Sequence, residues 1–117
     1  MMQFETTAGE KLEGELLQNY FRSLVNHFFK VLPMKENGEE SLPTYLNSLM
    51  AELLGCKSLV ITLNNNADYI TILSILQYLI DNIENPDFHV VEVRREVFHA
   101  ISLCNKLSSR FAESEVH

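Results

Sequence analysis

The sequence predicts a mainly α-helical (all-α) single domain, an antiparallel bundle of about four principal helices. Its 117 residues, 46% of them hydrophobic, fit one compact domain. Four segments repeat apolar residues every three or four positions, the spacing that places them on one face of a helix. Helix-breaking residues, Pro33, Gly55 and Pro86, separate these segments. We expect one domain over residues 1–117, with frayed ends at 1–6 and 112–117.

The first helix is expected to follow a capping box, in which the side chains of Thr7 and Glu10 satisfy each other's free backbone N–H groups. Pro33 is expected to end it, because proline lacks the N–H group that continues the hydrogen-bond ladder. At 100° per residue its apolar side chains fall on one broad face. They are Leu17, Tyr20, Phe21, Leu24, Phe28, Val31 and Leu32.

The second helix is expected to begin after Ser41, a good N-cap residue, with Pro43 tolerated in its first turn. Gly55 is a natural C-terminal stop. The apolar positions follow the i, i+3, i+4, i+7 pattern of a helix with one buried stripe. They are Leu42, Tyr45, Leu46, Leu49, Met50, Leu53 and Leu54.

The third helix is expected over 67–83, after three asparagines that supply a cap, and its seam is spaced alternately three and four residues apart. This spacing predicts the most buried helix. Its seam residues are Tyr69, Ile72, Leu76, Leu79 and Ile83. The last helix follows the break at 84–87 and ends near Phe111. Its apolar face holds Val90, Val93, Val97, Ala100, Ile101, Cys104, Leu107 and Phe111.

An α+β fold is the alternative, with two short strands at 58–63 and 88–93. The second half of the chain would then read β-α-β-α, an order that normally implies a parallel sheet. Two strands alone would leave long unpaired edges unless another chain completed the sheet. The helical bundle is therefore preferred.

Composition narrows the function classes. Nine Lys and Arg against sixteen Asp and Glu give this acidic chain a formal charge of −7, which opposes general attraction to nucleic acid or anionic membranes. No apolar run reaches the length of a membrane span and the first residues lack the pattern of a secretory signal, so we expect a cytoplasmic protein without membrane contact. Cys56 and Cys104 have no paired spacing and are expected to be reduced.

The sequence singles out no catalytic, cofactor-binding or metal-ligating residues. Glu96 and His99 have the Glu-x-x-His spacing of di-iron bundles, but such a site needs two copies and the chain has one. The four glycines are isolated, which gives no phosphate-binding loop, and no serine or cysteine stands in a nucleophile motif. We therefore expect a non-catalytic protein without cofactors. The alternative is a small enzyme or metal-binding protein that uses surface carboxylates and His99.

Two surface features point to binding. Four residues of the last helix fall within a narrow sector and form a candidate basic stripe, Arg95, His99, Lys106 and Arg110. Four apolar residues fall on helix faces that are expected to be exposed to solvent. They form a candidate interface: Phe29, Ile70, Ile75 and Tyr78.

These features predict a small protein-interaction or regulatory module that acts as a homo-oligomer, most simply a homodimer, or binds a partner protein helix. A third hypothesis is a nucleic-acid accessory factor that uses the basic stripe. The acidic total charge opposes it.

Overall fold

The protein is a bundle of four long helices. The computed structural model describes the backbone of residues 3–5 and 11–116, and the side chains of 14–60 and 63–110. The long helices are α1 (Gly14–Glu36), α2 (Leu42–Leu59), α4 (Ala67–Asn82) and α5 (Val90–Val116). A single turn, α3 (Ile61–Asn64), joins α2 to α4, and the two short strands β1 (Gln3–Glu5) and β2 (Lys11–Glu13) precede α1. The predicted mainly helical bundle is confirmed.

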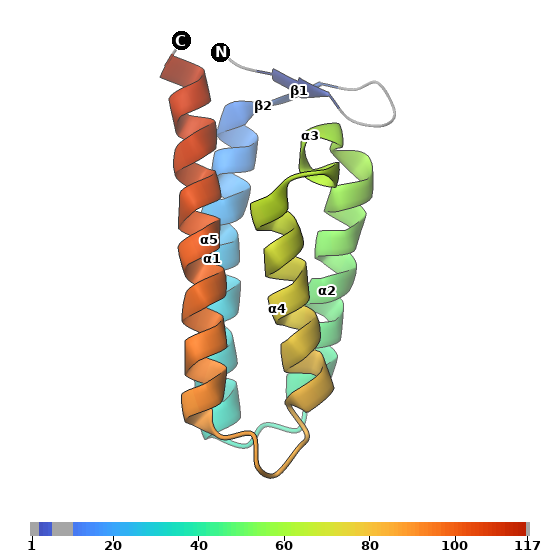
Figure 1. Ribbon diagram of the computed structural model, residues 1–117, viewed down its shortest axis with the longest axis vertical. Helices are drawn as coiled ribbons and strands as arrows, with labels where there is room; N and C mark the ends of the chain where they lie inside the picture. The colour runs from blue at the N-terminus through green and yellow to red at the C-terminus, as the bar shows by residue number, and fades with distance from the viewer. Residues whose placement is uncertain (1–2, 6–10, 117) are drawn as a thin grey trace.

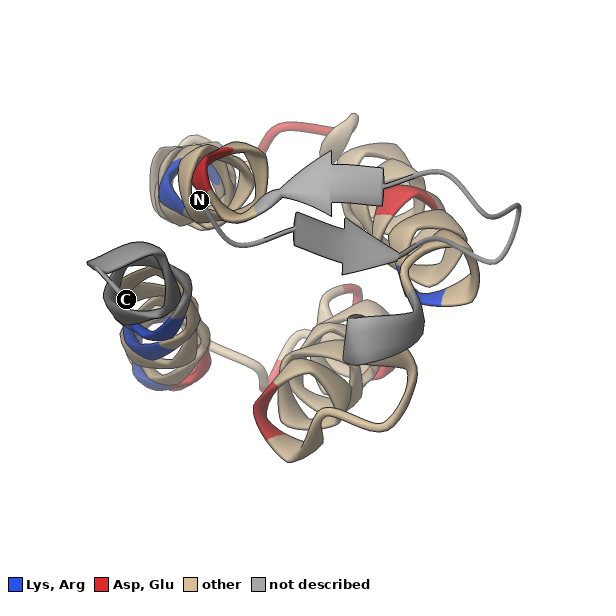
Figure 2. Ribbon diagram, turned by 90° about the horizontal axis from the view of Figure 1, so that it is seen from above, with Lys and Arg blue, Asp and Glu red and all other residues tan. Residues whose placement is uncertain are grey.

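The helices alternate in direction along the chain, so that each long helix is antiparallel to the next (Figure 1). Seen from above, they stand at the corners of a square in the order α1, α2, α4, α5 (Figure 2). α1 packs most extensively against α5, whereas α1 and α2 make the sparsest contact of the four neighbouring pairs. The bundle is elongated, with extents of 47 × 26 × 20 Å.

The core is built from the helix faces that the apolar spacing predicts. All five residues of the α4 seam are buried, as is the central part of the α5 face from Val93 to Leu107. The Tyr69 hydroxyl donates a hydrogen bond of 2.7 Å to the Leu53 carbonyl, and its ring meets the Phe21 ring edge-on at 5.9 Å. α4 is thereby joined to both α2 and α1.

Three helices extend beyond their predicted ends, and α5 runs to Val116 rather than ending near Phe111. α1 continues through Pro33 to Glu36, because a proline in the last turns forfeits a single ladder bond, and its own carbonyl still accepts from the Asn37 N–H at 2.9 Å. α2 continues through Gly55 to Leu59, since a glycine can also adopt helical dihedrals. The glycine with a left-handed backbone is Gly38, at φ +64°, in the turn after α1.

The N-terminal segment also differs from expectation. The capping box at 7–10 lies outside the described residues, and α1 begins at Gly14 rather than directly after it. β1 and β2 pair antiparallel with Phe4 opposite Leu12. The strand at 3–5 and the helix at 112–116 cover positions where frayed ends were expected. Fraying is a matter of motion and stays a prediction.

The alternative α+β fold is contradicted. Residues 58–63 form the end of α2, the linking Val60 and the start of α3, and 88–93 enter α5 at Val90. Val60 has an extended backbone, with φ −106° and ψ 110°, but it is a single residue between two helices and not part of a strand over 58–63. The asparagine cap is confirmed, because the Asn66 Oδ1 accepts from the Tyr69 N–H at 2.9 Å.

Candidate functional site

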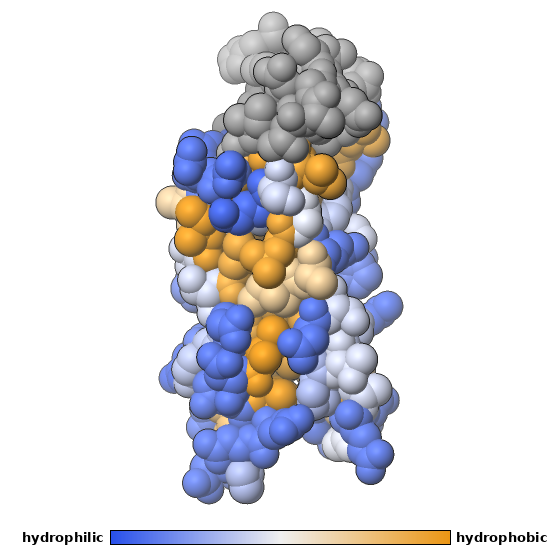
Figure 3. All heavy atoms as spheres, turned by 90° about the vertical axis from the view of Figure 1, so that its right-hand side faces the viewer, coloured by the Kyte–Doolittle hydropathy of each residue, from blue (hydrophilic) through white to orange (hydrophobic). Residues whose placement is uncertain are grey.

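Apolar side chains remain partly exposed along the face where α2 and α4 meet. Leu54 is 50% exposed and Ile70 is 42% exposed, beside half-buried residues that pack against the core. We call the following set the α2/α4 strip: Met50, Leu54, Ile70, Leu73 and Ile80. Figure 3 shows this side of the molecule, with apolar atoms running along it between columns of polar ones.

Helix periodicity explains why these residues share one face. On α2, the flank that bears Tyr45 faces α1, because the Tyr45 hydroxyl donates to the His27 carbonyl at 2.9 Å. Met50 and Leu54 lie on the opposite flank at 100° per residue and so border α4. On α4, the flank that bears Asp68 faces α5, since Lys106 pairs with that carboxylate at 3.4 Å. Ile70, Leu73 and Ile80 lie on the opposite flank of α4 at 100° per residue and so border α2.

Charges stand at the two ends of the strip. At the α3 end, the Lys57 Nζ donates to the Asn64 Oδ1 at 3.3 Å. At the end near the α4–α5 loop, Asp81 accepts from the Gln77 amide at 2.8 Å, and Glu84 follows the helix. The strip therefore has a cation at one end and two carboxylates at the other.

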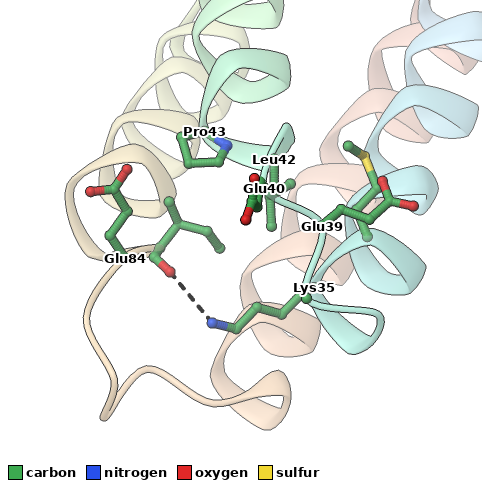
Figure 4. Close-up of a pocket in the computed structure, with 9 residues that line it drawn as sticks. Lys35, Glu39, Glu40, Leu42, Pro43 and Glu84 are labelled. Atoms are coloured by element: carbon green, nitrogen blue, oxygen red, sulfur yellow. Dashed lines mark hydrogen bonds between the residues drawn. The ribbon is translucent and has the colours of Figure 1, made fainter.

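A pocket of about 380 Å³ opens at the loop end of the bundle, between the α1–α2 connection and the end of α4 (Figure 4). The Lys35 Nζ reaches across it and donates to the Ile83 carbonyl at 3.4 Å. Three carboxylates, those of Glu39, Glu40 and Glu84, also line it. Glu84 follows α4, so the pocket lies at the same loop end of the bundle as Asp81.

The sparse α1–α2 contact holds a second group of polar side chains. His27, Tyr45 and Glu52 line a small cavity of about 180 Å³. Nearby, burial raises the pKa of the Tyr20 hydroxyl and of the Cys56 thiol. Burial thus disfavours the thiolate of Cys56, which is the nucleophilic form of a cysteine.

The four candidate interface residues do not form one surface. Ile75 is only 6% exposed and belongs to the core, so its assignment to an outer face is corrected. Phe29 lies between α1 and α5, where its ring meets that of Phe98 edge-on at 5.8 Å. Tyr78 packs edge-on against Phe88, 5.7 Å away, just before α5. Ile70 alone lies on the α2/α4 strip.

The four residues of the predicted basic stripe lie on one helix, α5. Arg95, His99, Lys106 and Arg110 are all exposed on α5. The ion pair between Lys106 and Asp68 already neutralises part of the stripe. Docking of an acidic partner there is a hypothesis, and a solvated face is the alternative.

The Glu96 and His99 pair stands apart from other ligand-type side chains. Glu96 is half-buried and His99 is exposed. Within the described residues, no three His, Cys, Asp or Glu side chains gather closely enough to hold a metal ion. Cys56 and Cys104 are free thiols on different helices.

Sequence reasoning missed most of the strip. Met50 and Leu54 were assigned to the buried stripe of the second helix, because the periodicity of one helix cannot reveal how far its neighbour covers it. A wide apolar arc, broader than one neighbour can cover, was the signal available.

Comparison with protein families, with curated proteins and with solved structures found no match. Among the described residues, no helix combines the length and the apolar character needed to cross a membrane. The assignment of a function therefore depends on the geometry of the surface.

Proposed function

We propose that the protein is a non-catalytic interaction module that works as a homo-oligomer, in its simplest form a homodimer, and that the α2/α4 strip is its contact surface. The observation that supports this proposal is the exposure of Leu54 on α2 and of Ile70 on α4, two helices that pack against each other. Contiguous apolar surface on a water-exposed protein commonly marks an interface, because burying it against a partner releases ordered water.

The strip is also pre-organised. Met50, Leu73 and Ile80 are half-buried and pack against the core, so the exposed side chains stand on a fixed apolar floor. A surface that is already ordered loses little conformational entropy on binding. Phe29 and Phe98 on the α1/α5 face are exposed to a similar extent, 42% and 47%, and their rings meet edge-on, so that face is the alternative contact surface.

A change of mass on mutation tests this proposal. We expect light scattering to give a dimer for the wild type at micromolar concentration, and Leu54→Glu to shift the mass toward the monomer, because a carboxylate would be desolvated at the contact. Helicity should be unchanged, since this side chain is half exposed. Phe98→Glu is the matched control on the other apolar face and should leave the dimer intact.

A wild type that stays monomeric from micromolar to millimolar concentration would contradict the proposal. Dissociation by Phe98→Glu with Leu54→Glu still dimeric would move the interface to the α1/α5 face. The alternative functions, an enzyme or metal protein that uses His99 and a nucleic-acid accessory factor, gain no specific contact in their favour. The cytoplasmic location stays a prediction.

A further inference from the structure

We propose that the α1/α5 face binds an acidic amphipathic helix of a partner protein. This face consists of the exposed side chains of Phe29, Val91 and Phe98 and of the half-buried Val25 and Leu32. It lies on helices that contribute nothing to the α2/α4 strip. The inference therefore goes beyond the proposed dimer, in which both copies would still present this face.

Helix periodicity brings the apolar side chains of this face together. On α1, Val25, Phe29 and Leu32 follow the i, i+4, i+7 spacing of a single helix face. On α5, Val91 and Phe98 are two turns, or about 10 Å, apart. The rings of Phe29 and Phe98 meet at 5.8 Å, so the two rows lie side by side. Val91 is 73% exposed, and a partner would cover it together with the two rings.

Cations gather on α1 and α5 although the whole chain is acidic. The described side chains of these two helices include seven of Lys or Arg and four of Glu. Residues 37–60 and 63–89 include one lysine and seven carboxylates. Figure 2 shows the Lys and Arg residues mainly on α1 and α5. This half of the bundle is therefore complementary in charge to an acidic partner.

Two arginines flank the aromatic pair. Arg22 lies two turns before Phe29 on α1, and Arg95 lies three residues before Phe98 on α5. Both arginines are exposed, and neither forms an ion pair within the described part of the chain. A guanidinium group binds a carboxylate through two parallel hydrogen bonds. These positions therefore favour a partner that carries acidic side chains beside its apolar ones.

Three of the four described carboxylates on these helices are engaged or turned away. Glu36 pairs with Arg94 at 3.7 Å, and Glu92 accepts from a backbone N–H at 3.0 Å. Glu96 lies 200° around α5 from Phe98 at 100° per residue. The fourth carboxylate lies in the first turn of α1. Repulsion of an acidic partner next to the aromatic pair is therefore weak.

A helix fits this face better than an extended segment does. The backbone N–H and C=O groups of α1 and α5 are paired within each helix, so an extended chain would find no strand edge to join. A helical partner satisfies its own backbone groups and packs its side chains between those of two neighbouring helices. The occupant is therefore a helix with apolar residues every three or four positions and Asp or Glu beside them.

Fluorescence anisotropy of a labelled synthetic peptide tests the proposal. The peptide repeats leucine every three or four positions and carries glutamate elsewhere, and a control peptide of the same composition spreads its leucines around the helix. We expect the wild type to bind the amphipathic peptide about tenfold more tightly than the control peptide. Phe98→Glu should weaken this binding about tenfold or more, because its carboxylate would be desolvated against the leucines.

Charge reversal tests the role of the arginines. Arg22→Glu should raise the peptide Kd about three- to tenfold, and added salt should raise the Kd of the wild type. Lys30→Glu is the matched control, because it makes the same charge change at an exposed position 100° around α1 from Phe29. Its Kd should stay near that of the wild type. Leu54→Glu, on the α2/α4 strip, should also leave the Kd unchanged.

The outcomes separate this proposal from the proposed dimer. Binding of the amphipathic peptide by a monomeric wild type would still support the site on α1 and α5. Equal affinity for the two peptides, or binding of neither, would overturn it. Binding that Leu54→Glu removes would place the peptide on the α2/α4 strip and overturn it too.

Two further results would name a different occupant. Dissociation of the dimer by Phe98→Glu would show that a second copy covers this face. Displacement of the peptide by an oligonucleotide, lost in Arg22→Glu, would replace the acidic helix by a nucleic acid. Circular dichroism of each variant checks the fold, and the exposed Arg22 keeps the test valid if Phe98→Glu unfolds the protein.

Discussion

At the scale of single residues, the core contains several weak acids that burial keeps neutral. Desolvation raises the pKa of Tyr69 and of Tyr20 well above the ordinary value for a phenol. The Tyr69 hydroxyl donates to the Leu53 carbonyl, whereas the buried Tyr20 hydroxyl has no hydrogen-bond partner among the described residues. Cys104, on the inner face of α5, is fully buried, and burial raises the pKa of its thiol to about 12.

Cys104 predicts a loss of stability in alkali. The native state binds the thiol proton more tightly than the unfolded state, where the pKa is near 9.0. The stabilisation is therefore complete below pH 9 and is lost as the pH rises from 9 toward 12. We expect the difference in unfolding free energy between the wild type and Cys104→Ala to shrink over this window, as measured by urea denaturation.

Tyr20, Tyr69 and Cys56 are present in both proteins. Their contributions therefore cancel in the difference in unfolding free energy between the wild type and Cys104→Ala. A gap between the two proteins that stays constant through the alkaline range would mean that the Cys104 thiolate is accommodated in the folded state. Thiol alkylation of the wild type below pH 9 is the companion measurement, and Cys104 should react only when the protein unfolds.

At the scale of elements, the apolar spacing predicted which face of each helix is buried, but it misplaced several ends. The face of a helix that is buried is determined by the pattern of many residues, whereas the point at which a helix ends depends on one or two. Pro33 and Gly55 weaken a helix without forbidding it, and tertiary packing of α1 and α2 outweighs their local cost of about 1 to 3 kcal/mol. β1 and β2 are too short for the alternation of apolar and polar residues in a strand to be recognised in the sequence.

The candidate site was predictable only in part. Ile70 stood out because it interrupts a polar half of its helix, and the four residues of the basic stripe could be grouped from the sequence because they lie on one helix. The apolar residues of the candidate interface lie on two helices, and their relation depends on the order of helices around the square (Figure 2). Periodicity within a helix does not contain that information.

Gly55 and Gly38 offer a test of backbone effects at this scale. A Cβ added at either position would meet nothing within 4 Å. The change in stability on substitution by alanine therefore reports the effect of the backbone conformation alone. Gly55→Ala should stabilise the protein by about 0.5–1 kcal/mol, because alanine loses less entropy in the interior of a helix. Gly38→Ala should destabilise it, by about 1 kcal/mol, since its φ of +64° is costly for alanine.

Urea unfolding of the two variants measures both effects. If Gly55→Ala were destabilising, α2 would end at Gly55 in solution, as the sequence alone indicated. If Gly38→Ala were neutral, the turn after α1 would adopt another conformation in solution.

At the scale of the whole molecule, two of the candidate binding surfaces face different ways. The α2/α4 strip lies on the side shown in Figure 3, whereas the basic stripe lies on α5, the helix diagonal to α2 (Figure 2). A change in one surface should therefore leave the other unaffected. This separation makes it possible to test the basic stripe without disturbing the proposed dimer.

The double variant with Arg95→Glu and Lys106→Glu is the test of that stripe. We expect the wild type not to bind single-stranded DNA or poly-glutamate at physiological ionic strength. The net charge of −7 repels a polyanion, and this repulsion outweighs the attraction of a few exposed cations. The double variant should keep the dimer mass of the wild type. It should also lose no more than about 1 kcal/mol of stability, because the Lys106 side chain is exposed and its ion pair with Asp68 is screened by solvent.

Fluorescence anisotropy of a labelled oligonucleotide and of labelled poly-glutamate measures the binding. Binding by the wild type that both added salt and the double variant remove would contradict a merely solvated stripe, because only a local cluster of cations could overcome the repulsion of the whole chain. Binding of the oligonucleotide alone would favour the nucleic-acid hypothesis. Binding of poly-glutamate alone would favour an acidic protein partner, docked on α5 while the α2/α4 strip holds the two copies together.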